Sequence, residues 1–160
     1  MKRIALIRED LCISGGCERV CVSLSNELSR YYDVYLINLY NNQSAYKINN
    51  NVNSFYLRNK KQRLRESLII DIIKLRSYLL KNKFDVVLII GGSAALQTFL
   101  ATIKTNIKVI FCQHNAVGLD LLNKKSLKAN FYRFILDNAI KFLTDRVVVL
   151  TKKRFNRIFY

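Results

Sequence analysis

Short apolar runs alternate with longer amphipathic stretches along most of this chain. The clearest run, residues 85–90, is apolar after its first residue and is followed by Gly91 and Gly92. Short apolar runs bounded by polar or glycine residues are typical of strands buried on both faces of a parallel sheet. The pattern predicts strands at residues 2–7, 34–39, 85–90, 108–112 and 146–150, and a weaker, edge-like strand at 52–57.

Helical periodicity occupies the segments between these runs. Beyond Gly15 and Gly16, apolar residues recur at the i, i+3, i+4, i+7 and i+11 positions of one helix face, namely Cys17, Val20, Cys21, Leu24 and Leu28. In this helix Glu18 lies in the first turn and Arg30 in the last, and both charges favour the helix dipole. Residues 63–81 form a longer amphipathic helix whose apolar set is Leu64, Leu68, Ile72, Leu75 and Leu79. Further helices are expected at 93–104 with Ser93 as N-cap, at 127–143, and after an N-cap at Thr151.

Strands and helices that alternate at this spacing predict an α/β fold. We expect a Rossmann-like, doubly wound and mainly parallel sheet with helices on both faces, in a single domain of 160 residues. Right-handed crossovers bring the carboxyl ends of such strands to one edge of the sheet, where these folds bind their ligands. Four loops are expected there: Gly15–Gly16, Gly91–Gly92–Ser93, His114–Asn115 and the loop at Thr151.

The glycine pair is the first candidate for chemistry. Glycines before a helix let the backbone approach a ligand, and the free N–H groups of the first helical turn attract an anion. Glu18, in that first turn, is the only acid that we expect near this edge, since Asp33 and Asp85 each open a strand at the opposite edge. The pair is neither a dinucleotide-binding Gly-x-Gly-x-x-Gly nor a Walker motif. A sharp turn that requires positive φ is the alternative interpretation.

His114 is the second candidate. It is the only histidine in the chain, it follows a buried strand, and Asn115 is its neighbour. Histidine titrates near neutral pH, and loops at strand ends carry function in sheets of this kind. The alternative is a structural histidine.

The cysteines and the apolar runs exclude several classes of protein. Cys12, Cys17, Cys21 and Cys112 include no Cys-x-x-Cys pair, and with one histidine they predict neither a metal site nor a disulfide. No apolar run approaches the ~20 residues of a membrane span. The apolar part of residues 1–7 ends too early for a signal peptide. We therefore expect an intracellular protein.

The net charge of +16 is unevenly distributed. Residues 1–50 carry a net +1 and residues 51–160 a net +15, with clusters at Lys60, Lys61, Arg63 and Arg65, at Lys124, Lys125 and Lys128, and at Lys152, Lys153, Arg154 and Arg157. Such an asymmetry indicates a polyanion or an anionic membrane surface as partner. For the first cluster we expect electrostatic adsorption to an anionic leaflet without insertion. A solvated basic surface with no specific partner is the alternative.

Several motifs, in order along the chain, resemble glycosyltransferase family 4. Residues 14–20 (SGGCERV) and 24–28 (LSNEL) are similar to that family's "GGAERV…LANEL" opening. The resemblance continues at residues 32–37 (YDVYLI), at 84–87 (FDVV), at the "HN" loop of residues 113–115 (QHN), and at 145–151 (DRVVVLT). It covers nearly the whole chain, and the order of the motifs carries more weight than any one of them. Cys17 departs from the small residue usual in the first motif.

The resemblance implies the N-terminal half of a GT-B fold, in which two Rossmann-like domains face each other across a cleft. The resemblance also implies that the reaction retains the anomeric configuration and that it requires no metal or other cofactor. It places the loop of Gly15, Gly16 and Glu18 near the donor phosphates and His114 near the transferred sugar, as the catalytic residue. Gly92, Ser93, Asn115 and Thr151 are assigned to the acceptor cleft.

The sequence therefore predicts the acceptor-side domain of a sugar transferase. We expect transfer from a nucleotide-sugar to a lipid-linked or surface-polysaccharide acceptor, in the cytoplasm and peripherally at the inner membrane face. The family's donor-binding C-terminal half would lie beyond Tyr160, so residues 1–160 are expected to be incompetent alone and to need a separate C-terminal domain or subunit. An excised domain, a truncated gene product and half of a split enzyme remain alternatives.

Two other classes stay open. The charge alone would suit a nucleic-acid-binding module, but no helix-turn-helix, RNP or zinc pattern is present, and nucleic acid is not an expected partner. A non-catalytic α/β domain that binds a small molecule is excluded only by the family resemblance.

Overall fold

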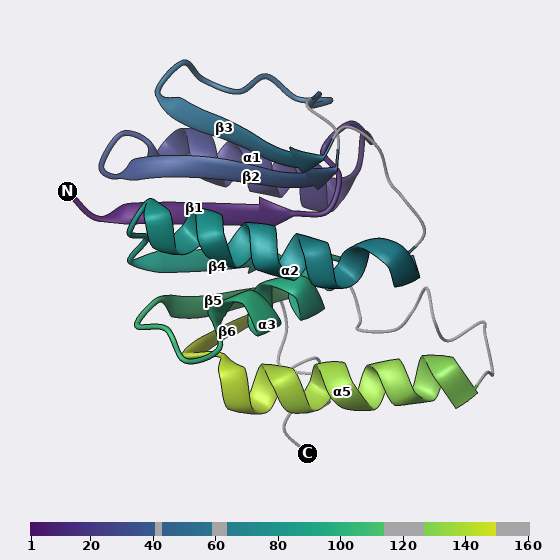
Figure 1. Ribbon diagram of the computed structural model, residues 1–160. Helices are drawn as coiled ribbons and strands as arrows, with labels where there is room; N and C mark the ends of the chain where they lie inside the picture. The colour runs from purple at the N-terminus through teal and green to yellow at the C-terminus, as the bar shows by residue number, and fades with distance from the viewer. Residues whose placement is uncertain (41–42, 59–63, 114–126, 150–160) are drawn as a thin grey trace.

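Six parallel strands form one sheet, in the order β3-β2-β1-β4-β5-β6. The computed structural model describes residues 1–40, 43–58, 64–113 and 127–149 (Figure 1). The strands are β1 (Arg3–Arg8), β2 (Asp33–Tyr40), β3 (Val52–Arg58), β4 (Val86–Ile90), β5 (Lys108–Gln113) and β6 (Arg146–Val149). Each lies where an apolar run predicted it, and β3 is an edge strand as expected.

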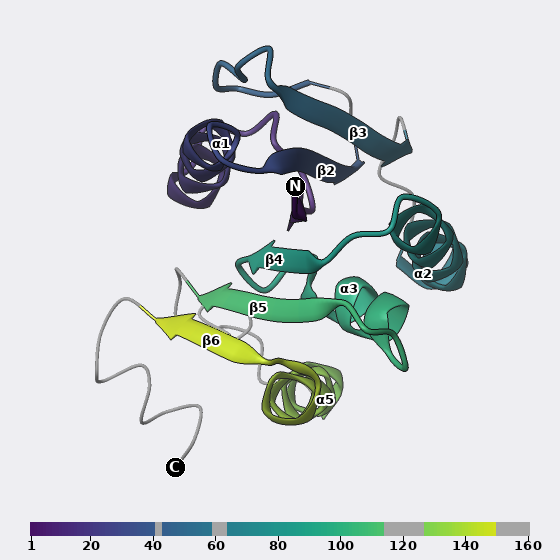
Figure 2. The same cartoon turned by 90° about the vertical axis from the view of Figure 1, so that its left-hand side faces the viewer.

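Helices cover both faces of the sheet, as Figure 2 shows in a view roughly along the strands. The helix α1 (Gly16–Leu28) lies on one face, and α2 (Leu64–Lys81), α3 (Ala95–Thr102) and α5 (Leu127–Leu143) form a layer on the other. This arrangement confirms the doubly wound α/β fold. No helix among the described residues is long and apolar enough to cross a membrane.

The period-2 alternation of the strands divides the apolar side chains between two cores. In β1, Ala5 and Ile7 pack into the core beneath α2, α3 and α5, whereas Ile4 and Leu6 pack into the core beneath α1. Burying one such aliphatic side chain contributes about 1.5–3 kcal/mol. Because both faces are covered, the inner parts of β1, β4 and β5 are apolar at successive positions, which is why they appear as continuous runs in the sequence.

The amino edge of the sheet is held by charged side chains. Arg3 at the start of β1 bonds Asp33 through Nε at 2.7 Å, and its backbone N–H donates to Asp85 at 2.7 Å. A third acid, Asp145, accepts from the Val109 backbone N–H at 2.8 Å. Asp33 and Asp85 therefore lie at the edge opposite the glycine loops, as predicted.

Two helices differ from the prediction at their ends. The first helix ends at Leu28, so Arg30 lies beyond it and no basic residue is in its last turn. The helix predicted at 93–104 is shorter, with Ala94 rather than Ser93 at the N-cap position. Ser93 lies one residue before that position, and its hydroxyl accepts a hydrogen bond from Arg8. The helices predicted at 63–81 and 127–143 match α2 and α5 to within one residue.

Candidate functional site at the switch point of the sheet

The two glycine loops meet where the strand order reverses. The strands β1 and β4 are neighbours, but the chain leaves β1 for α1 on one face and leaves β4 for α3 on the other. At such a switch point the two connections diverge and leave room for a ligand outside the carboxyl ends of the strands. Gly15 and Gly16 follow β1, and Gly91, Gly92 and Ser93 follow β4, so the structure brings these predicted site residues together.

A partly buried arginine joins the two loops. Arg8, the last residue of β1, donates from Nε and Nη2 to Oε1 of Glu18 at 2.9 and 2.5 Å. Its Nη1 donates to the carbonyl oxygen of Ile90 at 2.9 Å and to Oγ of Ser93 at 2.8 Å. We call Arg8, Glu18 and Ser93 the Arg8 cluster. It ties the end of β1, the first turn of α1 and the loop after β4 into one unit.

Glu18 has a different role from the one its sequence position predicted. Its side chain is only 8% exposed and is paired with Arg8, so it is not an acid open to a ligand. It is also not the only acid at this edge, because Glu9 and Asp10 follow β1 directly. The prediction used only the position of each acid along the chain. Whether an acid is paired with a base depends on which side chains the fold brings together.

The glycines have separate reasons for lacking a side chain. Gly91 has φ of +76°, and a Cβ there would lie 2.8 Å from Nη1 of Arg8. A Cβ on Gly15 would collide with Oε2 of Glu18. A Cβ on Gly16 would meet nothing within 4 Å, so open space lies at the start of α1. Gly15 has φ of −134°, and among the described glycines positive φ occurs at Gly91, so the sharp-turn interpretation of the Gly15–Gly16 pair is wrong. The open space at Gly16 leaves the close-approach interpretation in place.

The remaining predicted site residues are placed as follows. Gly92 is half-buried next to Ser93, and a Cβ added there would lie 3.9 Å from Cδ2 of Leu136 on α5. His114, Asn115 and Thr151 lie outside the described residues. The structure does place Gln113, the residue before His114, as the buried last residue of β5. These three assignments therefore stay predictions.

Arg8 is the site residue that sequence reasoning missed. In the sequence it is only the first charged residue after the apolar run that predicts the strand at residues 2–7. Two features of the sequence together indicate such a pair. One is a charged residue at the end of a fully buried strand, and the other is an acid three residues after a glycine N-cap. The pairing itself joins residues ten positions apart, and no periodicity in the sequence indicates it.

A second buried ion pair lies at the ends of β2 and β3. Asp71 on α2 is fully buried and accepts from Nη2 of Arg58 at 2.7 Å and from the hydroxyl of Tyr40 at 3.3 Å. The guanidinium of Arg58 also lies over the Tyr40 ring, 5.1 Å from its centroid. Burial raises the pKa of Asp71 and outweighs the opposing effect of Arg58. We assign this group to anchoring α2 on the strand ends.

The cysteine thiols are mostly buried. Cys17, Cys21 and Cys112 are buried, Cys12 is exposed, and none of the four is in a disulfide. Burial raises the pKa of Cys21 to about 12, which disfavours the thiolate that metal binding and nucleophilic attack require. Within the part of the chain that the structure describes, no group of three or more His, Cys, Asp or Glu side chains is arranged to hold a metal ion.

A small cavity lies away from the switch point. Its volume is about 40 Å³, and Leu11, Asn38, Ile48 and Phe55 are among the side chains that line it. That is room for roughly one water molecule and far too little for a sugar. Among the described residues, the Oδ1 atom of the buried Asn38 has no hydrogen-bond partner, so a bound water would satisfy it.

Comparison with protein families and curated proteins gives a consistent result. The profile of Glycosyltransferase Family 4 matches residues 14–154. An uncharacterized glycosyltransferase of Haemophilus influenzae is 26% identical over 115 residues, which cover 71% of this chain and 33% of that protein.

Solved structures of low sequence identity show the same fold. Sucrose-phosphate synthase from Thermosynechococcus elongatus superposes with a TM-score of 0.76 at 15% identity, covering 99% of this chain and 45% of that one. HepE of Anabaena, solved with UDP and glucose, gives 0.69 at 8% identity and 41% coverage of that chain. UDP-N-acetylglucosamine 2-epimerase from Rickettsia bellii gives 0.70 at 15% identity, again with 41% coverage. The chain thus spans less than half the length of these proteins and a third of its curated relative.

Proposed function

This chain belongs to glycosyltransferase family 4, and on that premise we propose that it is the acceptor-side domain of a retaining sugar transferase. The proposed donor is a nucleotide-sugar, and the proposed acceptor is a lipid-linked glycan or surface polysaccharide. The observation that carries the proposal is the open start of α1 beside the Arg8 cluster, at the switch point of a GT-B N-terminal fold.

The start of α1 suits a donor phosphate. The first N–H groups of a helix lack partners within the helix, and the dipole there attracts an anion by about 0.3–1 kcal/mol, or up to ~2 kcal/mol when partly buried. A free carboxylate at Glu18 would repel the phosphate, but Arg8 neutralises it at 2.5 Å. With Gly16 leaving open space above the helix, the backbone is accessible to a diphosphate.

The loops after β4 and β5 are proposed to hold the sugars. Ser93 belongs to the Arg8 cluster and Gly92 precedes it, and the acceptor would pass over both together with Asn115 and Thr151. His114 is proposed to act at the transferred sugar by hydrogen bonding as the bond to the diphosphate breaks. Charge that develops on the leaving diphosphate would be stabilised by fixed donors, the helix N–H groups among them. We propose that no metal or other cofactor takes part.

Two further elements of the proposal concern the rest of the protein. The relatives are at least twice as long as this chain, and HepE was solved with UDP and glucose. We therefore propose that a second, donor-binding domain or subunit completes the site. Because a millimolar ligand already requires about 4.1 kcal/mol, the helix N-terminus by itself should bind donor only weakly. We propose a cytoplasmic protein, peripheral at the inner face of the membrane.

Amide NMR of residues 1–160 tests where the donor binds. UDP-glucose and GDP-mannose are titrated to concentrations of about 10 mM, above the millimolar range expected for a site of this energy. The proposal expects fast-exchange shifts at the amides of Gly16, Cys17 and Ser93. Gly16→Val should abolish them, because its side chain fills the open space, while Gly16→Ala should retain them in part. Shifts confined to other regions, or micromolar donor affinity, would show that the donor site is misplaced.

A transfer assay tests the reaction. In an enzyme that joins residues 1–160 to a family 4 donor-binding domain, Gly16→Val is expected to remove transfer to a lipid extract. Tyr31→Ser, which alters an exposed side chain beyond the end of α1, should leave it unchanged. Activity near the unaltered level with Gly16→Val would contradict the assignment of the glycine loop. Sustained turnover by residues 1–160 alone would contradict the need for a second domain.

A further inference from the structure

The outer face of α2 is apolar where a helix on a water-facing surface should be polar. Its inner face packs Leu75 and Leu79 into the core. On the outside, Ile69 is 70% exposed and Ile73 is 61% exposed, and Ile70 and Leu80 are about half exposed. We call Ile69, Ile70, Ile73 and Leu80 the α2 stripe. The periodicity of the sequence identified only the inner set as the apolar face of this helix.

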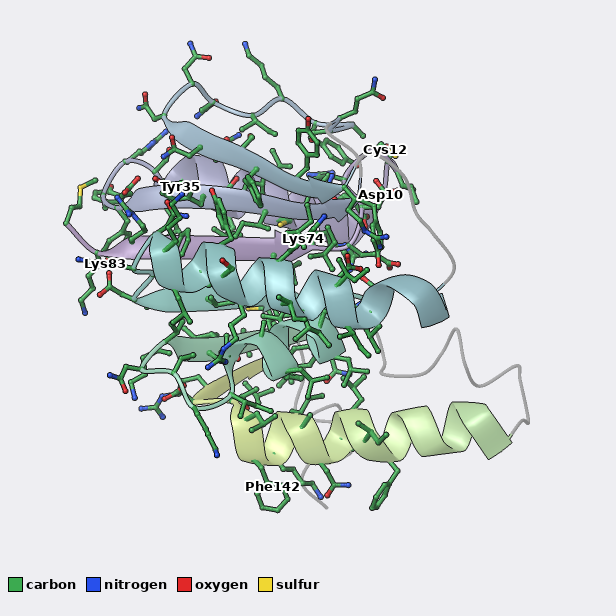
Figure 3. All side chains as sticks on the ribbon, in the orientation of Figure 1. Asp10, Cys12, Tyr35, Lys74, Lys83 and Phe142 are labelled. Carbon is green, nitrogen blue, oxygen red and sulfur yellow. The ribbon has the colours of Figure 1, made fainter. Side chains whose placement is uncertain are left out.

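The α2 stripe is accompanied by lysines. Lys74 and Lys81 are exposed and one heptad apart, so they lie on the same flank of the helix. Lys83 is also exposed, in the turn that follows (Figure 3). Among the described side chains of α2, α3 and α5, no carboxylate is exposed, since Asp71 is buried and Asp137 is half-buried. The described exposed side chains of these three helices are thus apolar or cationic, apart from Ser77.

The neighbouring helices continue the same composition. On α5, Phe134 and Phe142 are exposed, and Figure 3 shows Phe142 pointing away from the helix. Lys141 is exposed beside it, and Leu100 is exposed on α3. Of the large hydrophobic side chains that are exposed in the described part of the chain, most belong to this one helix layer.

We propose that the α2 stripe lies in the surface of an anionic lipid bilayer. An interfacial helix buries its apolar face about 5–10 Å into the boundary between headgroups and acyl chains, with lysines toward anionic headgroups. The stripe supplies the apolar face, and Lys74 and Lys81 supply the charge. The inference deepens the proposed function by naming the surface through which the domain would meet a lipid-linked acceptor.

Two other occupants match the surface less well. A second copy of this chain would bring lysines against lysines, and the described face offers no exposed carboxylate to pair with them. Nucleic acid matches the charge, but single strands are bound by aromatic side chains on which bases stack. The exposed aromatic residues of this layer, Phe134 and Phe142, lie on α5, and the α2 stripe itself is aliphatic. An anionic bilayer is the partner that matches both the charge and the aliphatic side chains.

A single-tryptophan experiment tests insertion, because the chain contains no tryptophan. Ile73→Trp places the fluorophore in the stripe, and Tyr31→Trp places it at an exposed position of similar accessibility beyond the end of α1. Both variants are mixed with phosphatidylcholine vesicles that contain either no anionic lipid or about 30% phosphatidylglycerol, with brominated acyl chains as quencher. Neither donor nor acceptor sugar is present, so this test can fail while the proposed transfer reaction stands.

The expected result is quenching of Ile73→Trp, but not of Tyr31→Trp, on the anionic vesicles. Lys74→Glu together with Lys81→Glu should weaken partitioning by about tenfold or more, while Lys47→Glu, at an exposed loop position, should change it little. Binding without quenching of Ile73→Trp would overturn the proposal in favour of purely electrostatic adsorption. Equal binding to neutral vesicles would overturn the role of charge. A blue shift of the Ile73→Trp emission without lipid, together with the mass of a dimer, would assign the surface to a second copy of the chain.

Discussion

Breaking the Arg8–Glu18 pair should destabilise the domain far more than breaking an exposed pair. The Arg8 and Glu18 side chains are 14% and 8% exposed, and their closest atoms are 2.5 Å apart. Arg8→Met keeps the aliphatic part of the side chain but leaves a buried carboxylate without its partner. Removing one member of a buried pair typically costs about 3–5 kcal/mol. The Ile90 carbonyl and the Ser93 hydroxyl also lose a charged donor, so we expect the upper part of that range.

The chain provides its own control. Arg30 and Glu27, three residues apart in sequence, form an ion pair at 3.2 Å, but their side chains are 65% and 55% exposed. Exposed pairs contribute about 0.2–1 kcal/mol. Arg30→Met therefore makes the same chemical change at a solvated pair and should cost about tenfold less. Because domains of this size are stable by about 5–15 kcal/mol, Arg8→Met should be measurable and could approach global unfolding.

Urea denaturation followed by far-ultraviolet circular dichroism measures both variants. The slope with denaturant should stay constant, so that a shift in midpoint reports stability. The double variant Arg8→Met, Glu18→Met removes both charges and should be more stable than Arg8→Met alone. Equal, small losses for Arg8→Met and Arg30→Met would refute the reasoning, since they would mean that the Arg8 cluster contributes no more than a surface pair. A double variant less stable than either single variant would refute it as well.

Three further outcomes are expected. Gly91→Ala should lower the free energy of unfolding by at least about 1–2 kcal/mol in the same urea assay. The φ of +76° disfavours any side chain, and the new Cβ would lie too close to the guanidinium of Arg8. An unchanged denaturation midpoint would contradict this. Hydrogen bonds from the backbone N–H of Val109 and then from the Lys108 side chain lower the pKa of Asp145. The ionised carboxylate therefore stabilises the fold above the usual carboxyl pKa near 4, and this stabilisation is lost as the pH falls through the lowered pKa of the folded state. Asp145→Asn should accordingly flatten the loss of stability in acid, and an unaltered pH profile would count against it. Iodoacetamide at neutral pH should alkylate the exposed Cys12 and spare Cys21, whose pKa is about 12, as peptide mass spectrometry would show; equal labelling in the folded state would argue against that burial.

The order and identity of the elements were predictable from the sequence. Strands buried on both faces are continuous apolar runs, and helices with one buried face repeat every three to four residues, so both signals are local. The boundaries of α5 agree with the prediction, and those of α2 and β4 agree to within one residue. The convergence of the glycine loops at one edge also followed, because parallel strands with right-handed crossovers leave little topological choice.

The partners of charged side chains were decided only by the tertiary structure. Glu18 appeared as an open acid and Ser93 as a helix cap, and both instead bind Arg8, which reaches Ser93 across 85 positions of sequence. Asp71 and Arg58 form a buried pair for which no local pattern exists. A hydrogen bond depends on distances of a few tenths of an ångström between segments far apart in the chain, and sequence periodicity carries no such information.

The outer face of α2 shows the same limit for apolar residues. Periodicity correctly identified Leu75 and Leu79 as core positions, since they repeat with the helix. It did not indicate that Ile69 and Ile73, on the opposite side, would remain uncovered, because the sequence contains apolar residues on both sides of this helix. Which face packs against the sheet and which is left exposed is set by the neighbouring elements, and only the assembled fold provides them.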